Sequence, residues 1–184
     1  DVRYFGTEMG DNTHRPAAPA DTWEHRCGDC KDKAYLLATL LHRLGIEAEP
    51  ALVSLDEGKG IGARLPSAAA FDHVIVRARI EGKPYWLDGT LSEQHGDLRK
   101  LDVRDYGLAL PVVAGSSELV PVLPPEGAAN NTIVLVESFS PDAAGDSIDL
   151  RVETTYTGLR AENMRYRLNA KGIDQLGRDY SNFY

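Results

Sequence analysis

An apolar stretch in the first quarter of the chain predicts a helix. From Ala34 to Leu41, every residue except Thr39 is apolar. A helix that is apolar nearly all round is expected to be buried on most of its sides. Asp29 stands where its side chain can accept hydrogen bonds from the free N–H groups of a first turn, and Gly45 suits a left-handed end. We therefore predict a central helix from Cys30 to Leu44.

Strand-like stretches follow this helix. The order of apolar and polar residues predicts strands at 46–54, 71–80 and 84–88. Glu81-Gly82-Lys83 predicts the turn of a hairpin that joins the second and third of these strands. A further apolar stretch covers residues 108–113.

The stretches between these elements are polar and predict loops. Residues 1–29 are irregular in pattern, with a loop around Pro16 and Pro19 that leads to the cysteine at position 30. Residues 55–70 are rich in glycine and predict a flexible surface loop. Residues 89–107 are polar and predict a segment that is mostly loop.

Glycines and prolines near 115–130 predict a boundary. Beyond it, residues 132–139 and 147–156 alternate in polarity around a turn-forming segment, which predicts a second hairpin. Residues from about 161 onward show roughly helical spacing. We therefore predict a core over 1–115 and a hairpin followed by a helix over 116–184.

Composition limits the class of partner. The chain is 42% apolar and 26% charged, which suits a soluble domain with a packed core. Its net charge of −8 argues against nucleic acid or an anionic membrane as the main partner, since both require concentrated positive charge. No apolar run approaches the roughly 18 residues that span a bilayer, so we expect no membrane insertion. The N-terminus lacks an initiator Met and a signal-peptide pattern, which we interpret as an excerpt of a longer protein.

Cys30 stands at the predicted start of the central helix. There, the free N–H groups and the positive end of the helix dipole favour thiolate, which is the nucleophilic form of cysteine. Gly28 lets the backbone approach a substrate closely. The alternative is that Cys30 is a small buried core residue, as most cysteines are.

His73 and Asp88 complete a candidate triad. Alternation places His73 on the strand face shared with Phe71 and Ile75. If Glu81-Gly82 forms a two-residue turn, Asp88 lies diagonal to His73 on the same face, whereas a three-residue loop would turn it away. A carboxylate that accepts from one imidazole nitrogen directs the other toward a thiol. The separate alternatives are a structural histidine and an aspartate that merely begins a turn.

Three separated motifs resemble the transglutaminase-like core of the papain-like superfamily. They are Gly28-Asp29-Cys30-Lys31-Asp32-Lys33-Ala34, Phe71-Asp72-His73-Val74 and Tyr85-Trp86-Leu87-Asp88-Gly89-Thr90. The resemblance covers roughly residues 1–113 and is greatest to a bacterial branch in which this core lies between β-rich domains. It implies an α+β fold with the central helix packed on an antiparallel sheet, and a catalytic triad of Cys30, His73 and Asp88. The segment from about 116 resembles the start of the β-rich domain that follows the core.

The chain departs from this family pattern at three positions. Cys27 stands where an aromatic residue is usual, Asp72 where Asn is common, and Gly89 where Pro often follows the aspartate. None of the three is a member of the triad.

Cys27 and Cys30 also form a CxxC pair. A reversible disulfide between them would block Cys30. A structural zinc would need two further ligands, and we expect neither a metal nor a cofactor. A thiol–disulfide redox protein would require a thioredoxin-like context, which the elements after Leu44 do not provide.

The favoured function is cysteine-dependent acyl transfer on a carboxamide or peptide bond, by transamidation or hydrolysis, with a protein or peptide as substrate. The alternative is a transglutaminase-like scaffold or peptide-binding module without catalysis. By family analogy alone, we expect a location in the bacterial cell envelope or periplasm.

Overall fold

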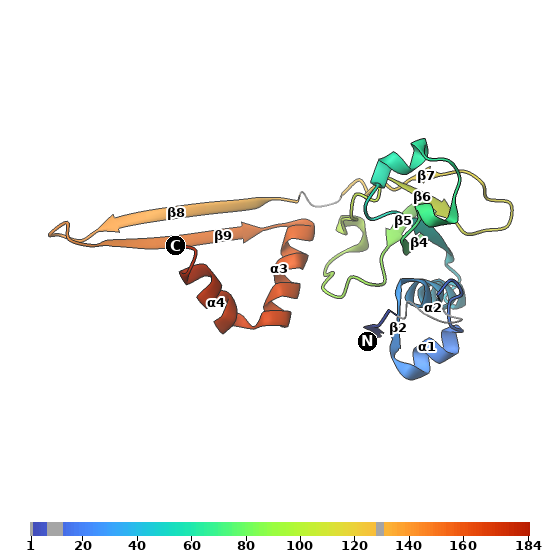
Figure 1. Ribbon diagram of the computed structural model, residues 1–184, viewed down its shortest axis with the longest axis horizontal. Helices are drawn as coiled ribbons and strands as arrows, with labels where there is room; N and C mark the ends of the chain where they lie inside the picture. Colours follow the sequence, from blue (N-terminus) through green and yellow to red (C-terminus); the bar gives the residue numbers. More distant parts are fainter. Residues whose placement is uncertain (1, 7–12, 128–130) are drawn as a thin grey trace. The chain divides into compact units, whose positions relative to one another are not determined.

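The computed structural model describes residues 2–6, 13–127 and 131–184. The chain forms two compact units (Figure 1). The first comprises Asp1–Ser92 and Val103–Pro125, and the second comprises Glu93–Asp102 and Glu126–Tyr184. A short strand at Val120–Pro121 still pairs with the sheet of the first unit.

The first unit is built on a five-stranded antiparallel sheet in the order β5-β4-β3-β6-β7. The strands are β3 (Glu47–Val53), β4 (His73–Ile80), β5 (Lys83–Leu87), β6 (Leu108–Pro111) and β7 (Val120–Pro121). The three predicted strands and the apolar stretch at 108–113 each form a strand of this sheet. Together with the helices, this sheet confirms the α+β class.

The hairpin of β4 and β5 turns through two residues. Ile80 pairs with Lys83, and the residues between them, Glu81 and Gly82, have φ values of 52° and 78°. Such turns match the twist of a two-stranded ribbon. The register continues to Val76 opposite Leu87, so Asp88 leaves β5 next to the end of β4 that carries His73.

Helix α2 (Cys30–Arg43) is the central helix, and the predicted bounds are confirmed to within one residue. The Asp29 side chain accepts from the N–H groups of Lys31 and Asp32, and the Asp32 carboxylate accepts from the Asp29 N–H. This reciprocal cap satisfies the first turn. Gly45 follows the helix with φ of 77°.

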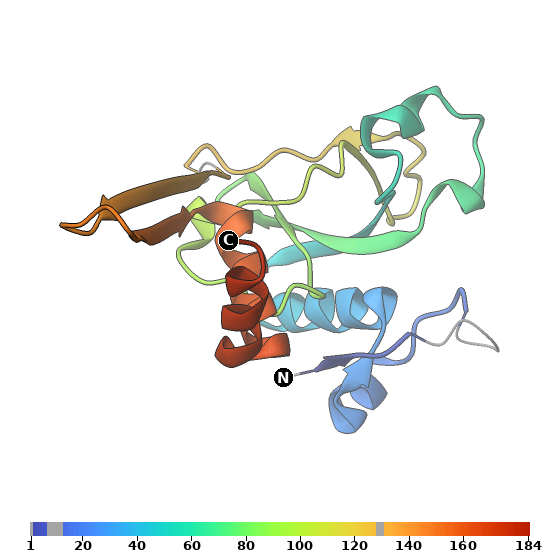
Figure 2. The ribbon, with the colours of Figure 1, turned by 60° about the vertical axis from the view of Figure 1, so that its left-hand side comes forward.

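Most residues of the apolar run in α2 are buried or half-buried, as expected, but two are exposed. Ala34 and Ala38 pack on Ala48, Val76 and Ala78 of the sheet. On other sides of the helix, Tyr35 is 42% exposed and Leu40 is 39% exposed. Figure 2 shows α2 against one face of the sheet, with the short helix α1 on its other side. The apolar run was therefore longer than the face that is buried.

The N-terminal region contains structure that the sequence did not predict. Helix α1 (Pro19–His25) packs on α2, and β1 (Arg3–Tyr4) pairs in parallel with β2 (Cys27–Gly28). The expectation of an irregular stretch over 1–29 is therefore wrong for these segments, while residues 7–12 lie outside the described residues. Two short 3₁₀ helices, η1 (Gly58–Ala63) and η2 (Ala68–Ala70), likewise replace the loop expected at 55–70. Ile61 of η1 is only 4% exposed, which ties this segment to the fold.

A second apolar cluster lies on the sheet face that carries Ile75 and Trp86. Segments after β5 contribute to it, so the polar stretch 89–107 is not merely a surface loop. The stretch 89–107 contributes Val103 and Tyr106 to this cluster, and the segment after β7 contributes Val122. The segment 89–107 also contains the 3₁₀ helix η3 (Leu98–Lys100).

The second unit contains the predicted hairpin, formed by β8 (Ile133–Pro141) and β9 (Ile148–Tyr156), and then α3 (Gly158–Lys171) and α4 (Ile173–Ser181). The tyrosine hydroxyls of Tyr156 and Tyr180 lie 3.0 Å apart and join α4 to the hairpin. The Arg165 guanidinium of α3 donates to the Glu93 carbonyl, which holds residues 93–102 in this unit. Across the described ranges, no helix combines the length and apolar character needed to cross a bilayer.

Candidate active site

His73 and Asp88 meet at one end of the β4–β5 hairpin. His73 is the first residue of β4, and Asp88 directly follows β5. The His73 Nε2 atom lies 3.0 Å from Asp88 Oδ2, and the two residues are only 8% and 6% exposed. An ionised carboxylate can only accept, so Nε2 carries the proton in this bond.

Asp88 is held at both carboxylate oxygens. The backbone N–H and the hydroxyl of Thr90 donate to Oδ1 over 2.8 and 2.6 Å. The Tyr106 hydroxyl donates to Oδ2 over 2.5 Å. Burial acts to raise the pKa of Asp88, but His73, by hydrogen bond and charge, and then Thr90 and Tyr106 outweigh it and lower this pKa to about 2. Asp88 is therefore an anion at neutral pH.

His73 interacts with both of the other predicted triad members. Burial acts to lower its pKa, but the hydrogen bond to Asp88 and then the interaction with Cys30 outweigh burial and raise the pKa of His73 to about 9. Because Asp88 engages Nε2, Nδ1 is the ring nitrogen that remains for the Cys30 thiol. The structure thus brings Cys30, His73 and Asp88 together, from a helix start and two neighbouring strands.

The local packing places Cys30 at the first position of α2. Gly28 is buried in front of it, and a Cβ atom there would lie 2.7 Å from the Asp32 Cβ. Only glycine therefore fits at this end of β2, against the first turn of α2. The Asp29 side chain occupies the N–H groups of Lys31 and Asp32, whereas no described residue accepts from the N–H of Cys30. This N–H remains for a ligand at the thiol.

Two lysines of the same turn lie near the site and have protein partners. Lys31 forms an ion pair with Asp29, so its charge is compensated by the capping residue. Burial lowers the pKa of Lys33, although the charge of Asp88 opposes this shift. The Lys33 Nζ atom donates to the Val2 carbonyl over 2.8 Å and so ties the N-terminal segment to α2.

Asp72, the acid next to His73 in the sequence, points to a loop. Its Oδ1 accepts from the Leu55 N–H over 2.7 Å, and its side chain is exposed. Its negative charge therefore does not join the buried pair of His73 and Asp88.

Sequence reasoning missed Tyr106 and Thr90. Tyr106 is 1% exposed, and its ring stacks on His73 with centroids 5.9 Å apart and an interplanar angle of 28°. Thr90 ends one of the quoted motifs but had no assigned role. The only sequence signal for Tyr106 was an aromatic residue within a polar stretch, which is also common on protein surfaces.

Cys27 lies on β2 opposite Arg3, and both cysteines are free thiols. Within the described ranges, no three His, Cys, Asp or Glu side chains gather in a way that could hold a metal ion.

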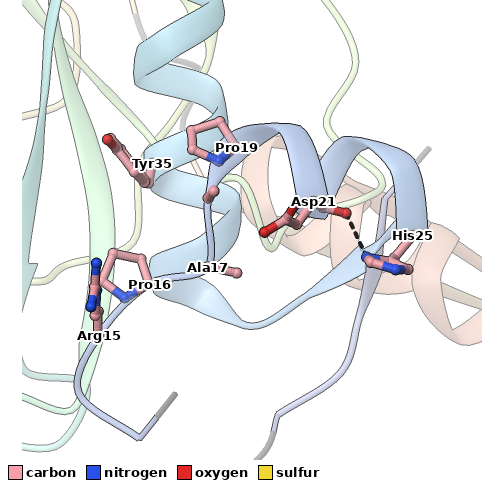
Figure 3. A pocket seen from close by; sticks show the side chains of 8 residues that line it. Arg15, Pro16, Ala17, Pro19, Asp21, His25 and Tyr35 are labelled. Atoms are coloured by element: carbon pink, nitrogen blue, oxygen red, sulfur yellow. Dashed lines mark hydrogen bonds between the residues drawn. The ribbon is translucent and has the colours of Figure 1, made fainter. Parts of the chain in front are cut away.

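An open pocket of about 780 Å³ lies beside α1. Figure 3 shows Pro16, Pro19 and Tyr35 around it, and a hydrogen bond of 2.8 Å from His25 Nδ1 to the Asp21 carbonyl. None of Cys30, His73 and Asp88 lines this pocket, so it is separate from the candidate active site.

Comparison with known proteins leaves the family of the chain open. No protein-family model matches the chain, and no curated protein matches its sequence significantly. Among solved structures, a protein described as a putative protease from Parabacteroides distasonis resembles it with a TM-score of 0.45 and 12% identity. The match covers 90% of this chain and 46% of that one, so the chain spans less than half of that protein's length.

Proposed function

We propose that this chain is a cysteine-dependent acyltransferase or hydrolase with a transglutaminase-like, papain-like core. The observation that carries the proposal is the position of His73, which is bonded at Nε2 to Asp88 and interacts with Cys30. A histidine held between a carboxylate and a thiol is the arrangement that activates a cysteine nucleophile. The packing of α2 on an antiparallel sheet agrees with the family resemblance of the three motifs.

In the first half-reaction, His73 already holds the proton of the Cys30 thiol, since its pKa is raised to about 9, and the thiolate Sγ atom attacks the carbonyl carbon of a carboxamide or peptide bond. The carbonyl oxygen becomes an oxyanion in the tetrahedral intermediate. The C–N bond then breaks, and His73 gives its proton to the leaving amine. The products of this half-reaction are a thioester on Cys30 and a free amine.

The second half-reaction releases the acyl group. Water or an amine attacks the thioester carbon, and His73 takes a proton from this nucleophile. The C–S bond breaks, and the proton returns to the sulfur. Water yields a carboxylic acid and an amine yields a new amide, so one site serves both hydrolysis and transamidation.

The N–H of Cys30 is the donor best placed for the oxyanion. The capping side chain of Asp29 accepts from the next two N–H groups of the turn and leaves the first one available. The Cys30 N–H group lies at the helix start, where the helix dipole also favours negative charge. Asp88 stays ionised throughout and stabilises the imidazolium form of His73.

The test uses p-nitrophenyl acetate, an activated acetyl donor that needs no specific substrate pocket. We expect a burst of nitrophenolate and one acetyl group on Cys30, located by peptide mass spectrometry. Added glycinamide should accept the acetyl group and yield acetylglycinamide. His73→Ala should slow the acetylation of Cys30 by about 100-fold or more, and Cys30→Ala should abolish the burst.

Cys27→Ser is the control variant, because it removes a thiol that lies outside the proposed triad. It should retain the burst. Acetylation of Cys30 at the same rate with and without His73 would contradict the proposal. The non-catalytic peptide-binding module would then be the better account.

A further inference from the structure

Tyr106 contacts both residues that support the proposed nucleophile. Its ring stacks on the His73 imidazole at 5.9 Å, and its hydroxyl donates to Asp88 Oδ2 over 2.5 Å. His73 Nε2 binds the same oxygen over 3.0 Å. One buried side chain therefore packs on the ring and also holds the acceptor of the ring's hydrogen bond.

The contacts of Asp88 show how the Tyr106 hydroxyl restricts the carboxylate. Thr90 holds only Oδ1, and a carboxylate held at one oxygen can still turn about its Cβ–Cγ bond. The Tyr106 hydroxyl fixes the second oxygen on the side of His73. Burial and the Asp88 charge raise the pKa of Tyr106, so its hydroxyl stays protonated and remains a donor.

The position of Tyr106 is itself well determined. The side chain is 1% exposed and belongs to the apolar cluster of Ile75 and Trp86. Its neighbours therefore restrict the motion of the ring, and with it the position of the hydroxyl.

We propose that Tyr106 is a positioning residue, which acts through Asp88 and by stacking to hold His73 in the orientation that the Cys30 thiol requires. This inference rests on the proposed function and deepens it. The described contacts of Tyr106 at the site are with His73 and Asp88, so we expect its effect to pass through these two residues.

The test compares Tyr106→Phe, which removes the hydroxyl and keeps the ring, with Tyr85→Phe. Tyr85 is a half-buried tyrosine on β5 that faces away from Asp88 and receives the same substitution. We expect Tyr106→Phe to slow the acetylation of Cys30 by p-nitrophenyl acetate about fivefold at neutral pH, the effect of one hydrogen bond. Tyr85→Phe should leave this rate unchanged.

A double-mutant cycle separates positioning from packing. In an Asp88→Asn background, Tyr106→Phe should have little further effect, because the route through the carboxylate is already broken. An equal loss in both backgrounds would overturn the inference and make Tyr106 a packing residue.

A readout without activity distinguishes failure of this inference from failure of the proposed function. The His73 Nε2–H proton, hydrogen-bonded to Asp88, should give a downfield proton NMR signal in the full chain. We expect its exchange with water to be about fivefold faster in Tyr106→Phe, since the freed carboxylate turns away more often. Wild-type exchange in this variant would overturn the role of Tyr106. If His73→Ala leaves Cys30 acetylation unchanged, the proposed function fails. The exchange rate of the His73 proton would still test whether Tyr106 fixes the Asp88 carboxylate.

Discussion

His73 Nε2 lies 3.0 Å from Asp88 Oδ2, although the two residues are 15 positions apart in the chain. The two-residue turn at Glu81 and Gly82 sets this distance, because it fixes the register of β4 against β5. A shift by one residue would turn Asp88 to the other face of the sheet. The pairing of base and carboxylate is thus a property of one hairpin.

The pKa of His73 should respond to both of its partners. Burial alone lowers this pKa, whereas Asp88 and then Cys30 raise it. NMR titration of the His73 ring should therefore give a pKa of about 9 in the wild type and a lower pKa in Cys30→Ala. In Asp88→Asn the pKa of His73 should fall further, because the hydrogen bond to Asp88 opposes burial more strongly than the interaction with Cys30 does. Equal values in the wild type and Asp88→Asn would contradict this order.

Stability should fall as the pH rises from about 6.5 to 9. The folded chain binds the His73 proton more tightly than the unfolded chain, since the pKa of His73 rises from 6.5 to about 9 on folding. This contribution is complete below pH 6.5 and is lost as the pH passes through 9. Its upper limit is about 3 kcal/mol.

Urea unfolding at several pH values measures this dependence. In His73→Ala, the slope of stability between pH 6.5 and 9 should flatten, whatever the absolute stability of the variant. The matched control is His42→Ala, because His42 is an exposed residue of α2. A slope in His73→Ala as steep as in the wild type would assign the pH dependence to other groups.

Gly28→Ala should destabilise the fold and disturb the nucleophile. A Cβ atom at residue 28 would lie 2.7 Å from Asp32 Cβ, so the start of α2 must shift. We expect a loss of about 1–3 kcal/mol in the free energy of unfolding, together with slower acylation of Cys30. Gly60→Ala is the control, since no atom lies within 4 Å of a Cβ at that residue. Similar losses in the two variants would refute the steric argument.

The cap of α2 should contribute measurably to stability. Asp29→Ala removes the acceptor of two first-turn N–H groups. It should lower the free energy of unfolding by about 1 kcal/mol, while Asp29→Ser should restore most of that loss. Thermal unfolding of the three proteins checks this order, and a serine variant no more stable than the alanine variant would contradict it.

Local signals in the sequence were sufficient for α2 and for the main strands. Asp29 and Gly45 mark the ends of α2 because capping depends on neighbouring residues. Helix α1 was missed because its local signal, Pro19, has two readings. Pro19 suggested a loop, whereas in the structure it occupies the first turn of a seven-residue helix, where proline is tolerated. This short helix depends on packing, and its Thr22 is 2% exposed.

Parts of the candidate site depend on contacts that no local pattern encodes. From the sequence, the face on which Asp88 lies depended on whether the turn has two or three residues. The register of the hairpin in the structure shows a two-residue turn. Tyr106 reaches Asp88 across 18 positions through a segment with little regular structure. The path of such a segment follows from tertiary packing, so neither the stack on His73 nor the hydrogen bond to Asp88 could be predicted.

The central claim is that His73 activates Cys30. The most direct test is the rate of Cys30 alkylation by iodoacetamide against pH, in a Cys27→Ser background, with and without His73→Ala. The account predicts fast alkylation well below pH 8 that is lost with His73→Ala. Alkylation at the same rate in both proteins across the pH range would contradict the account.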